Sequence, residues 1–181
     1  MGNIYRLSSF DFRQEDIHMK TEPRDEHRWL DQLVGEWTYE ADFAIGPNQP
    51  RQKSKGTEDV HSLGGLWVIA KGEGEMPSGG IAKTVMTLGF DTYRNTYVGT
   101  WVGSMMAYLW TYNGTMDSTG TILTLEAEGP SFFKEGKTAK YRDMILLKGD
   151  GVRLLTSFAL GDDGKWREFM TTTYNRKLNY N

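Results

Sequence analysis

Residues 36–45 read EWTYEADFAI, and this stretch decides the fold class because its apolar and polar residues alternate. Trp37, Tyr39 and Phe43 stand at odd positions, while Glu40 and Asp42 stand at even positions. Successive side chains of a β-strand point to opposite faces. The pattern therefore predicts a strand with one buried side, and the Gly-Pro-Asn sequence of residues 46–48 ends it.

Nine comparable segments follow, each bounded by turn residues. They lie near residues 55–63, 66–76, 81–91, 96–103, 107–116, 120–128, 138–148, 152–160 and 165–176. Their connections are mostly short and carry Gly, Asn or Asp, which tolerate the positive φ of tight hairpin turns. About ten strands joined in this way predict an all-β, antiparallel, up-and-down barrel, because closure removes the exposed edges of a sheet.

One short helix is expected ahead of the barrel. Residues at helical spacing precede the first strand, and they are His27, Trp29, Leu30, Leu33 and Val34. Gly35 follows as a stop signal. Residues 1–23 are polar and end at Pro23, so we expect an N-terminal extension that is either of low order or a docked arm. Residues 24–181 are then the barrel domain.

Composition restricts the classes of partner. The chain of 181 residues fits one domain, and its net charge of −3 comes from signs that alternate along the sequence. Nucleic acid is therefore not an expected partner. The absence of Cys excludes disulfides and thiolate chemistry. We find no signal-peptide core in the first twenty residues and no run of about 18 apolar residues, so we expect a cytoplasmic protein that does not span a membrane.

The sequence offers little support for metal or covalent chemistry. Only His61 of the three His residues lies in the β region, where Asp59 shares its strand face. Two ligands do not define a metal centre, although an axial haem ligand at His61 stays open. No nucleophile elbow is present. We expect no metal and no cofactor. The glycines in residues 71–75 lie inside a β segment, where we expect a bend or bulge rather than a phosphate loop.

Aromatic residues in the middle of the chain are the most informative group. Trp101 shares a strand face with Tyr97, and Tyr112 shares one with Trp110. They form either a packed barrel core or the lining of a cavity for an apolar or amphipathic ligand. The candidate ligand-binding residues are Trp67, Trp101, Trp110, Tyr112, Arg142 and Met144, with Arg142 as a polar anchor.

A family resemblance supports the barrel. Its motifs are VGEW at 34–37, LGGLW at 63–67, LGFD at 88–91, YVGTW at 97–101, LWTYNG at 109–114, LTLEAEGP at 123–130, DGKW at 163–166 and YNR at 174–176. In this order they resemble the bacterial domain of unknown function 1579 family over about residues 24–177. The resemblance implies a lipocalin-like (calycin) barrel without an assigned role. In such barrels an Arg at the end of the last strand often covers the Trp of the first, which here implies that Arg176 lies over Trp37.

Related barrels define the alternatives. Nitrobindin-like barrels bind haem through a His on a late strand, and this chain has no His after His61. Fatty-acid-binding barrels hold a carboxylate with inward Arg and Tyr, and the late strands here offer Arg142, Arg153, Arg167 and Tyr174.

Three hypotheses follow for function. The first is a barrel that binds a small apolar or amphipathic molecule. The second is an enzyme that uses the cavity, with Arg142, Tyr112 or Glu168 as acid, base or anion holder; it requires a buried ionisable pair with perturbed pKa values. The third is a packed barrel that acts as an interaction protein, such as a homodimer, through an exposed apolar surface.

Overall fold

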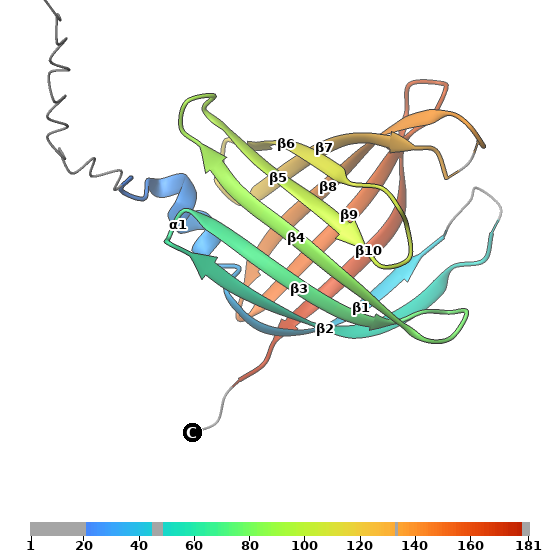
Figure 1. The fold of residues 1–181 in the computed structure, drawn as a ribbon, viewed down its shortest axis with the longest axis horizontal. Coiled ribbons are helices and arrows are strands. Elements are labelled where there is room, and N and C mark those ends of the chain that lie inside the picture. Colours follow the sequence, from blue (N-terminus) through green and yellow to red (C-terminus); the bar gives the residue numbers. More distant parts are fainter. Residues whose placement is uncertain (1–20, 45–48, 133, 179–181) are drawn as a thin grey trace, which may run out of the picture.

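The structure, a computed structural model, describes residues 21–44, 49–132 and 134–178. It consists of one helix and ten strands around a closed barrel (Figure 1). The elements are α1 Asp25–Asp31, β1 Gly35–Phe43, β2 Gln52–Leu63, β3 Trp67–Glu75, β4 Ile81–Asp91, β5 Thr96–Gly103, β6 Trp110–Met116, β7 Ile122–Pro130, β8 Thr138–Gly149, β9 Val152–Leu160 and β10 Trp166–Arg176.

Each strand pairs antiparallel with its neighbours in sequence, and β1 closes the barrel against β10. This closing register runs from Trp37 opposite Arg176 to Phe43 opposite Met170. The predicted all-β, up-and-down barrel with one short helix is confirmed. Closure pairs each described strand on both sides, with β6 and β7 paired over only part of their lengths, and it removes the two free edges that an open sheet would have.

Strand β3 corrects one expectation. Its pairing with β2 and β4 is continuous through Gly72 and Gly74, so the predicted bend or bulge is absent. The glycines provide space instead. A Cβ atom at Gly74 would lie 1.9 Å from the hydroxyl oxygen of Tyr39, and one at Gly72 would lie 2.4 Å from the hydroxyl of Thr84. The two glycines therefore let inward side chains of neighbouring strands pack on the barrel wall.

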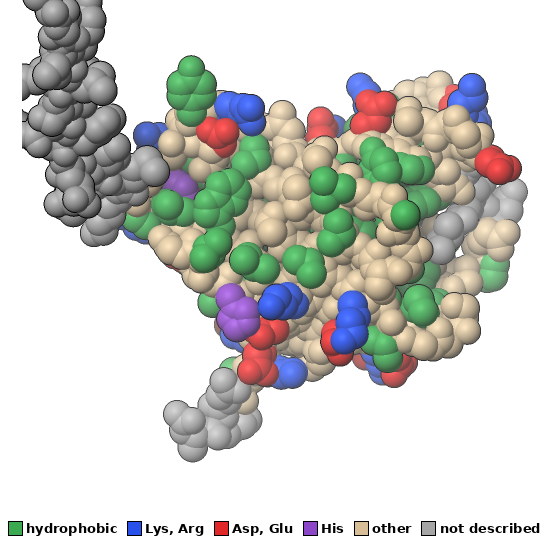
Figure 2. Space-filling view, in the orientation of Figure 1, with side chains coloured by type: hydrophobic (Ala, Val, Ile, Leu, Met, Phe, Trp, Pro, Cys, Tyr) green, Lys and Arg blue, Asp and Glu red, His purple; other side chains and the backbone are tan. Residues whose placement is uncertain are grey.

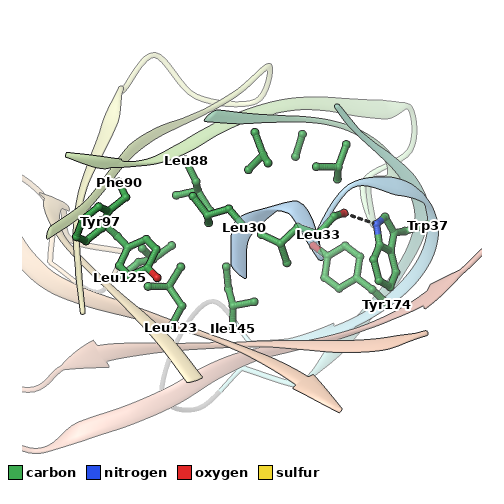
Figure 3. Close-up of a cluster of buried hydrophobic side chains, with 13 residues drawn as sticks. Leu30, Leu33, Trp37, Leu88, Phe90, Tyr97, Leu123, Leu125, Ile145 and Tyr174 are labelled. Carbon is green, nitrogen blue, oxygen red and sulfur yellow. Dashed lines mark hydrogen bonds between the residues drawn. The ribbon is translucent and has the colours of Figure 1, made fainter. Parts of the chain in front are cut away.

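Helix α1 covers one end of the barrel. Leu30 and the following Leu33 are 1% and 2% exposed, and they point into the barrel interior among side chains such as Leu88, Leu123 and Ile145 (Figure 3). The Trp29 indole donates a 2.9 Å hydrogen bond to the Gly120 carbonyl in the β6–β7 hairpin. Burial of its apolar face stabilises this short helix, because a helix of two turns is not stable alone.

The predicted contact between Trp37 and Arg176 is confirmed. The Arg176 guanidinium lies 4.2 Å from the ring centroid of Trp37, and it also donates a 2.7 Å hydrogen bond to the Gln32 carbonyl. The Arg153 guanidinium also lies close to the Trp37 ring, 4.7 Å from its centroid. Gly35, with φ +132°, leaves the space that the Arg176 side chain occupies. The contact joins the first strand, the last strand and the end of α1.

Burial shows which strand faces point inward. Trp37 on β1, Leu88 on β4, Leu125 on β7 and Ile145 on β8 are almost fully buried, and residues two positions away along each strand share their side of the wall. The alternation that identified the strands in the sequence is therefore the alternation between barrel interior and exterior.

Candidate functional site

The barrel wall is incomplete between β6 and β7. These strands pair only over residues 113–116 and 123–126, although β6 begins at Trp110 and β7 continues to Pro130. Residues 110–112 and 127–130 therefore face each other without a hydrogen-bonded ladder. The sequence predicted a strand from Ala107, which is wrong, because the segment before Trp110 has no such ladder in the described structure.

Aromatic side chains bridge part of this gap. The Tyr108 hydroxyl donates a 3.0 Å hydrogen bond to the Glu128 carbonyl, which takes the place of a backbone bond. The Trp110 ring packs on Gly129, where a Cβ atom would lie 2.5 Å from the ring. Gly129 is thus a position at which the ring and the backbone of β7 approach closely. These two contacts hold the end of the gap that is farthest from α1.

A pocket of about 290 Å³ occupies the gap. Its lining comes from both faces of the wall, since Tyr112, Ala127 and Tyr141 point inward while their neighbours point outward. The lining residues are Thr111, Tyr112, Asn113, Glu126, Ala127, Glu128, Lys140, Tyr141 and Trp166. Tyr112 and Tyr141 thus border the pocket with side chains that point into the barrel.

A buried carboxyl group lies behind the pocket. The Tyr112 hydroxyl, reaching inward from the gap, donates a 2.7 Å hydrogen bond to Oδ2 of Asp143 on β8. Burial raises the pKa of Asp143, and the hydroxyl groups of Ser157 and Tyr112 reduce this rise. Burial and the nearby Asp143 charge raise the pKa of Tyr112 well above its ordinary value. Tyr112 therefore keeps its proton and acts as the donor, while burial makes the charged form of Asp143 costly.

Ser157 faces Asp143 in the β8–β9 ladder and is 1% exposed. Its hydroxyl acts on the pKa of Asp143, yet Oγ meets the geometry of no hydrogen bond with the described residues. Asp143 itself keeps part of its surface accessible, although it points into the barrel.

A second buried polar group lies nearer α1, and it is an ion pair whose two charges neutralise each other. Arg153 on β9 forms an ion pair with Glu58 on β2, and their side chains are 6% and 13% exposed. The Arg153 guanidinium also stacks 3.8 Å from the ring centroid of Tyr174. The adjoining cavity, bordered by Met86 and Leu155, measures only about 30 Å³. This end of the barrel is a packed core with room for one or two water molecules.

The structure separates the predicted site residues into two groups. Trp101, Trp110 and Tyr112 point inward, as the cavity hypothesis requires. Trp67 is 39% exposed on the outer face, and Met144 lies on the face opposite to Asp143. The six residues therefore do not converge on one interior pocket.

Arg142 also lies on the outer face. It forms a 2.6 Å ion pair with Glu126 and stacks 4.2 Å from the ring centroid of Trp166, so it supports the rim of the gap pocket from outside. Sequence reasoning missed Asp143 and Ser157. An available signal was the acid at 143, which stands on the same strand face as Tyr141 and Ile145.

Other candidates lie away from this pocket. His61 is on the outer face, with Nε2 2.8 Å from a carboxylate oxygen of Asp59. No group of three His, Asp or Glu side chains in residues 21–44, 49–132 and 134–178 could hold a metal ion. Within the same ranges, no helix is long and apolar enough to cross a membrane.

Comparisons with known proteins agree with the barrel. The chain is similar to Rv2717c from M. tuberculosis, with 12% identity, a TM-score of 0.60 and coverage of 87% of this chain and 100% of that chain. It is also similar to the S-type phycobiliprotein lyase CPES from Guillardia theta, with 14% identity, a TM-score of 0.56 and the same two coverages. At these identities the likeness shows the fold alone. No curated protein matches the sequence. The model of the family "Protein of unknown function (DUF1579)" matches residues 22–176, and the chain therefore belongs to this family.

Proposed function

We propose that this protein binds a small amphipathic molecule in the pocket between β6 and β7. One observation carries the proposal: β6 and β7 are unpaired where a pocket of about 290 Å³ lies, and Tyr112 in its lining donates a hydrogen bond to the inward carboxyl of Asp143. Small-molecule sites are concave, apolar in most of their lining and equipped with a few convergent polar groups. Tyr141 and Trp166 supply the aromatic surface here, and Tyr112 with Asp143 supplies the polar end.

The size of the pocket restricts the ligand. Drug-sized ligands occupy pockets of roughly 300–1,000 Å³, so the gap pocket suits a molecule of one or two rings. A long fatty acid is not favoured, because Arg153, an inward Arg that could anchor its carboxylate, is paired with Glu58 beside a cavity of about 30 Å³. We keep the lipocalin-like classification and a cytoplasmic location as parts of the same proposal, and the absence of Cys is compatible with that location.

Native mass spectrometry of the gently purified protein tests the proposal. We expect a stoichiometric extra mass that is released on denaturation and is lost in Thr111→Trp, whose new side chain would fill the pocket. Thr115→Trp is the matched control, since Thr115 is also exposed on the outer face of β6 but lies outside the pocket. An extra mass that both variants retain would place the ligand elsewhere and contradict the proposal.

A second candidate function is an enzyme that uses the same pocket. The Tyr112–Asp143 pair favours it, because two buried ionisable groups with raised pKa values are typical of general acid catalysis. In this alternative the neutral Asp143 or Tyr112 would give a proton to a bound substrate. Turnover that is lost in both Tyr112→Phe and Asp143→Asn, with binding retained, would favour the enzyme over the carrier.

A third candidate is a homodimer formed through the outer face of β3–β5. Hydrophobic side chains are visible across this face (Figure 2), and they include Trp67, Val85 and Val102 at 39%, 38% and 39% exposure. Val85 and Val102 are register partners on β4 and β5, so they form one apolar surface. Sedimentation equilibrium that shows a dimer in the native protein and a monomer in Val85→Lys would support this role.

A further inference from the structure

We propose that the ligand of the β6–β7 pocket is an organic cation, an amine carried on a small aromatic or apolar body, whose ammonium group reaches Asp143 and Ser157. This inference rests on the proposed function, because it names the chemical class of the same ligand.

The interior carries one acid without a counter-ion. Glu58 is paired with Arg153, whereas no Lys or Arg of the described chain forms an ion pair with Asp143. The Asp143 carboxyl accepts a hydrogen bond from the Tyr112 hydroxyl, which carries no charge. Burying a carboxylate without a counter-ion costs free energy, and a bound cation would supply that counter-ion.

The hydroxyl of Ser157, which lies beside the same carboxyl, is a second indication. Ser157 is 1% exposed and lies opposite Asp143, and its Oγ has no hydrogen-bond partner among the described residues. Buried hydroxyls are nearly always satisfied in native proteins. An ammonium group has three donors, so it could donate to the Asp143 carboxylate and to Ser157 Oγ at once.

The pocket lining distinguishes an organic cation from a metal ion and from an anion. A divalent metal would need several more oxygen or nitrogen ligands than Asp143 and Ser157 supply. An anion would be repelled by Asp143, and Lys140 is the one cationic residue of the described lining. The rings of Tyr112, Tyr141 and Trp166 suit a cation with an apolar body, because aromatic faces attract cations and cover apolar surface.

Isothermal titration of the full chain with three matched probes tests the inference. The probes are 2-naphthylmethylamine, 2-naphthylmethanol and 2-naphthylacetate, which share one apolar body and differ in charge. We expect the amine to bind at least about tenfold more tightly than the alcohol, since a charge-assisted hydrogen bond replaces a neutral one. The acetate should bind more weakly than the alcohol.

Asp143→Asn supplies the first control on the mechanism. It keeps an oxygen for the Tyr112 hydroxyl but removes the charge, so the preference for the amine over the alcohol should disappear. Asp150→Asn removes the same charge at an exposed turn of the β8–β9 hairpin, where φ is 50° and Asn is equally tolerated, and the preference should persist. Thermal unfolding of each variant verifies that it is folded.

The pH dependence of binding supplies a second readout that needs no variant. The groups that face Asp143 are Tyr112, Ser157 and Tyr174, with the Glu58–Arg153 pair beyond Tyr174. Ser157 does not titrate, both tyrosines have raised pKa values, and burial raises the pKa of the Asp143 carboxyl, so Asp143 is the group expected to lose its charge above the ordinary carboxyl range on acidification. As the pH is lowered, affinity for the amine should begin to fall at a pH above about 4, the ordinary pKa of Asp. Affinity for the alcohol should stay unchanged over the same range.

The outcomes separate the two proposals. Equal binding of amine and alcohol, or a preference that survives in Asp143→Asn, would overturn the cation and leave the binding barrel standing. Tighter binding of the acetate would also overturn it. If the alcohol and the amine both fail to bind, the ligand class is wrong and the proposed function loses its support as well.

Discussion

At the scale of single residues, the barrel interior contains two acids in contrasting environments. Glu58 is neutralised by Arg153, whereas Asp143 contacts only neutral hydroxyl groups. Sequence parity puts Asp143 on one strand face with Tyr141 and Ile145, but it does not show that this face points inward, and sequence reasoning therefore missed Asp143. The direction of a strand face depends on how the closed sheet curves, and this information is not present in the residues of one strand.

The environment of Asp143 predicts a pH-dependent stability. Because the folded state raises the pKa of this carboxyl, the folded protein binds its proton more tightly than the unfolded chain does. The contribution of Asp143 should therefore become more favourable to folding as the pH falls through the folded pKa. Asp143→Asn should be more stable than the native protein at neutral pH, and the difference should shrink on acidification. Urea unfolding between about pH 8 and pH 5 measures it, with Asp150→Asn as the control.

Removing the charge of Glu58, which is paired with Arg153, should destabilise the protein. This is the opposite of the result expected for Asp143. Glu58→Gln leaves the Arg153 guanidinium buried without a counter-charge, which should lower the free energy of unfolding by about 3–5 kcal/mol. Glu40→Gln breaks an exposed pair with Lys55, whose side chains are both 68% exposed, and should change it by less than about 1 kcal/mol. Urea unfolding curves compare the two, and equal effects would show that the interior pair is not structurally important.

At the scale of elements, nearly all strands could be predicted because alternation and turn residues are local signals. The beginnings of β2 and β6 differ most from the predictions, because β2 begins at Gln52 instead of residue 55 and β6 begins at Trp110 instead of Ala107. Tyr108 and Trp110 have the alternation of a strand, yet hydrogen bonding also requires a partner strand within reach. Since β7 diverges from β6 after Glu126, the local pattern could not reveal where the ladder ends.

The bond from Tyr108 to Glu128 predicts how firmly the gap is held. Tyr108→Phe removes this hydrogen bond, which is worth about 0.5–1.5 kcal/mol. Amide exchange in residues 110–112 and 127–129 should then become faster, by up to about tenfold, while the paired residues 113–116 stay unchanged. Tyr93→Phe, at a side chain 97% exposed, serves as the control. Unchanged exchange in the gap would mean that the Trp110–Gly129 contact alone holds the two strands.

At the scale of the whole molecule, the barrel combines a packed end under α1 with an opening in its wall. Closure of the barrel was predictable, because ten short strands without a covering layer need it. The opening was not, since it arises from the relative register of strands around the entire closed sheet. The inward positions of Trp101, Trp110 and Tyr112 agree with the hypothesis of a lined cavity, but of these three only Tyr112 lines the pocket between β6 and β7.

The central claim is that this pocket binds a small molecule, and the binding of neutral 2-naphthylmethanol to wild type, Thr111→Trp and Thr115→Trp tests it most directly. The two variants add the same side chain to the same face of β6, and only Thr111 lines the pocket. We predict that wild type and Thr115→Trp bind the alcohol with similar affinity and that Thr111→Trp loses at least about tenfold. Equal binding by all three proteins, or no binding by any of them, would contradict the account.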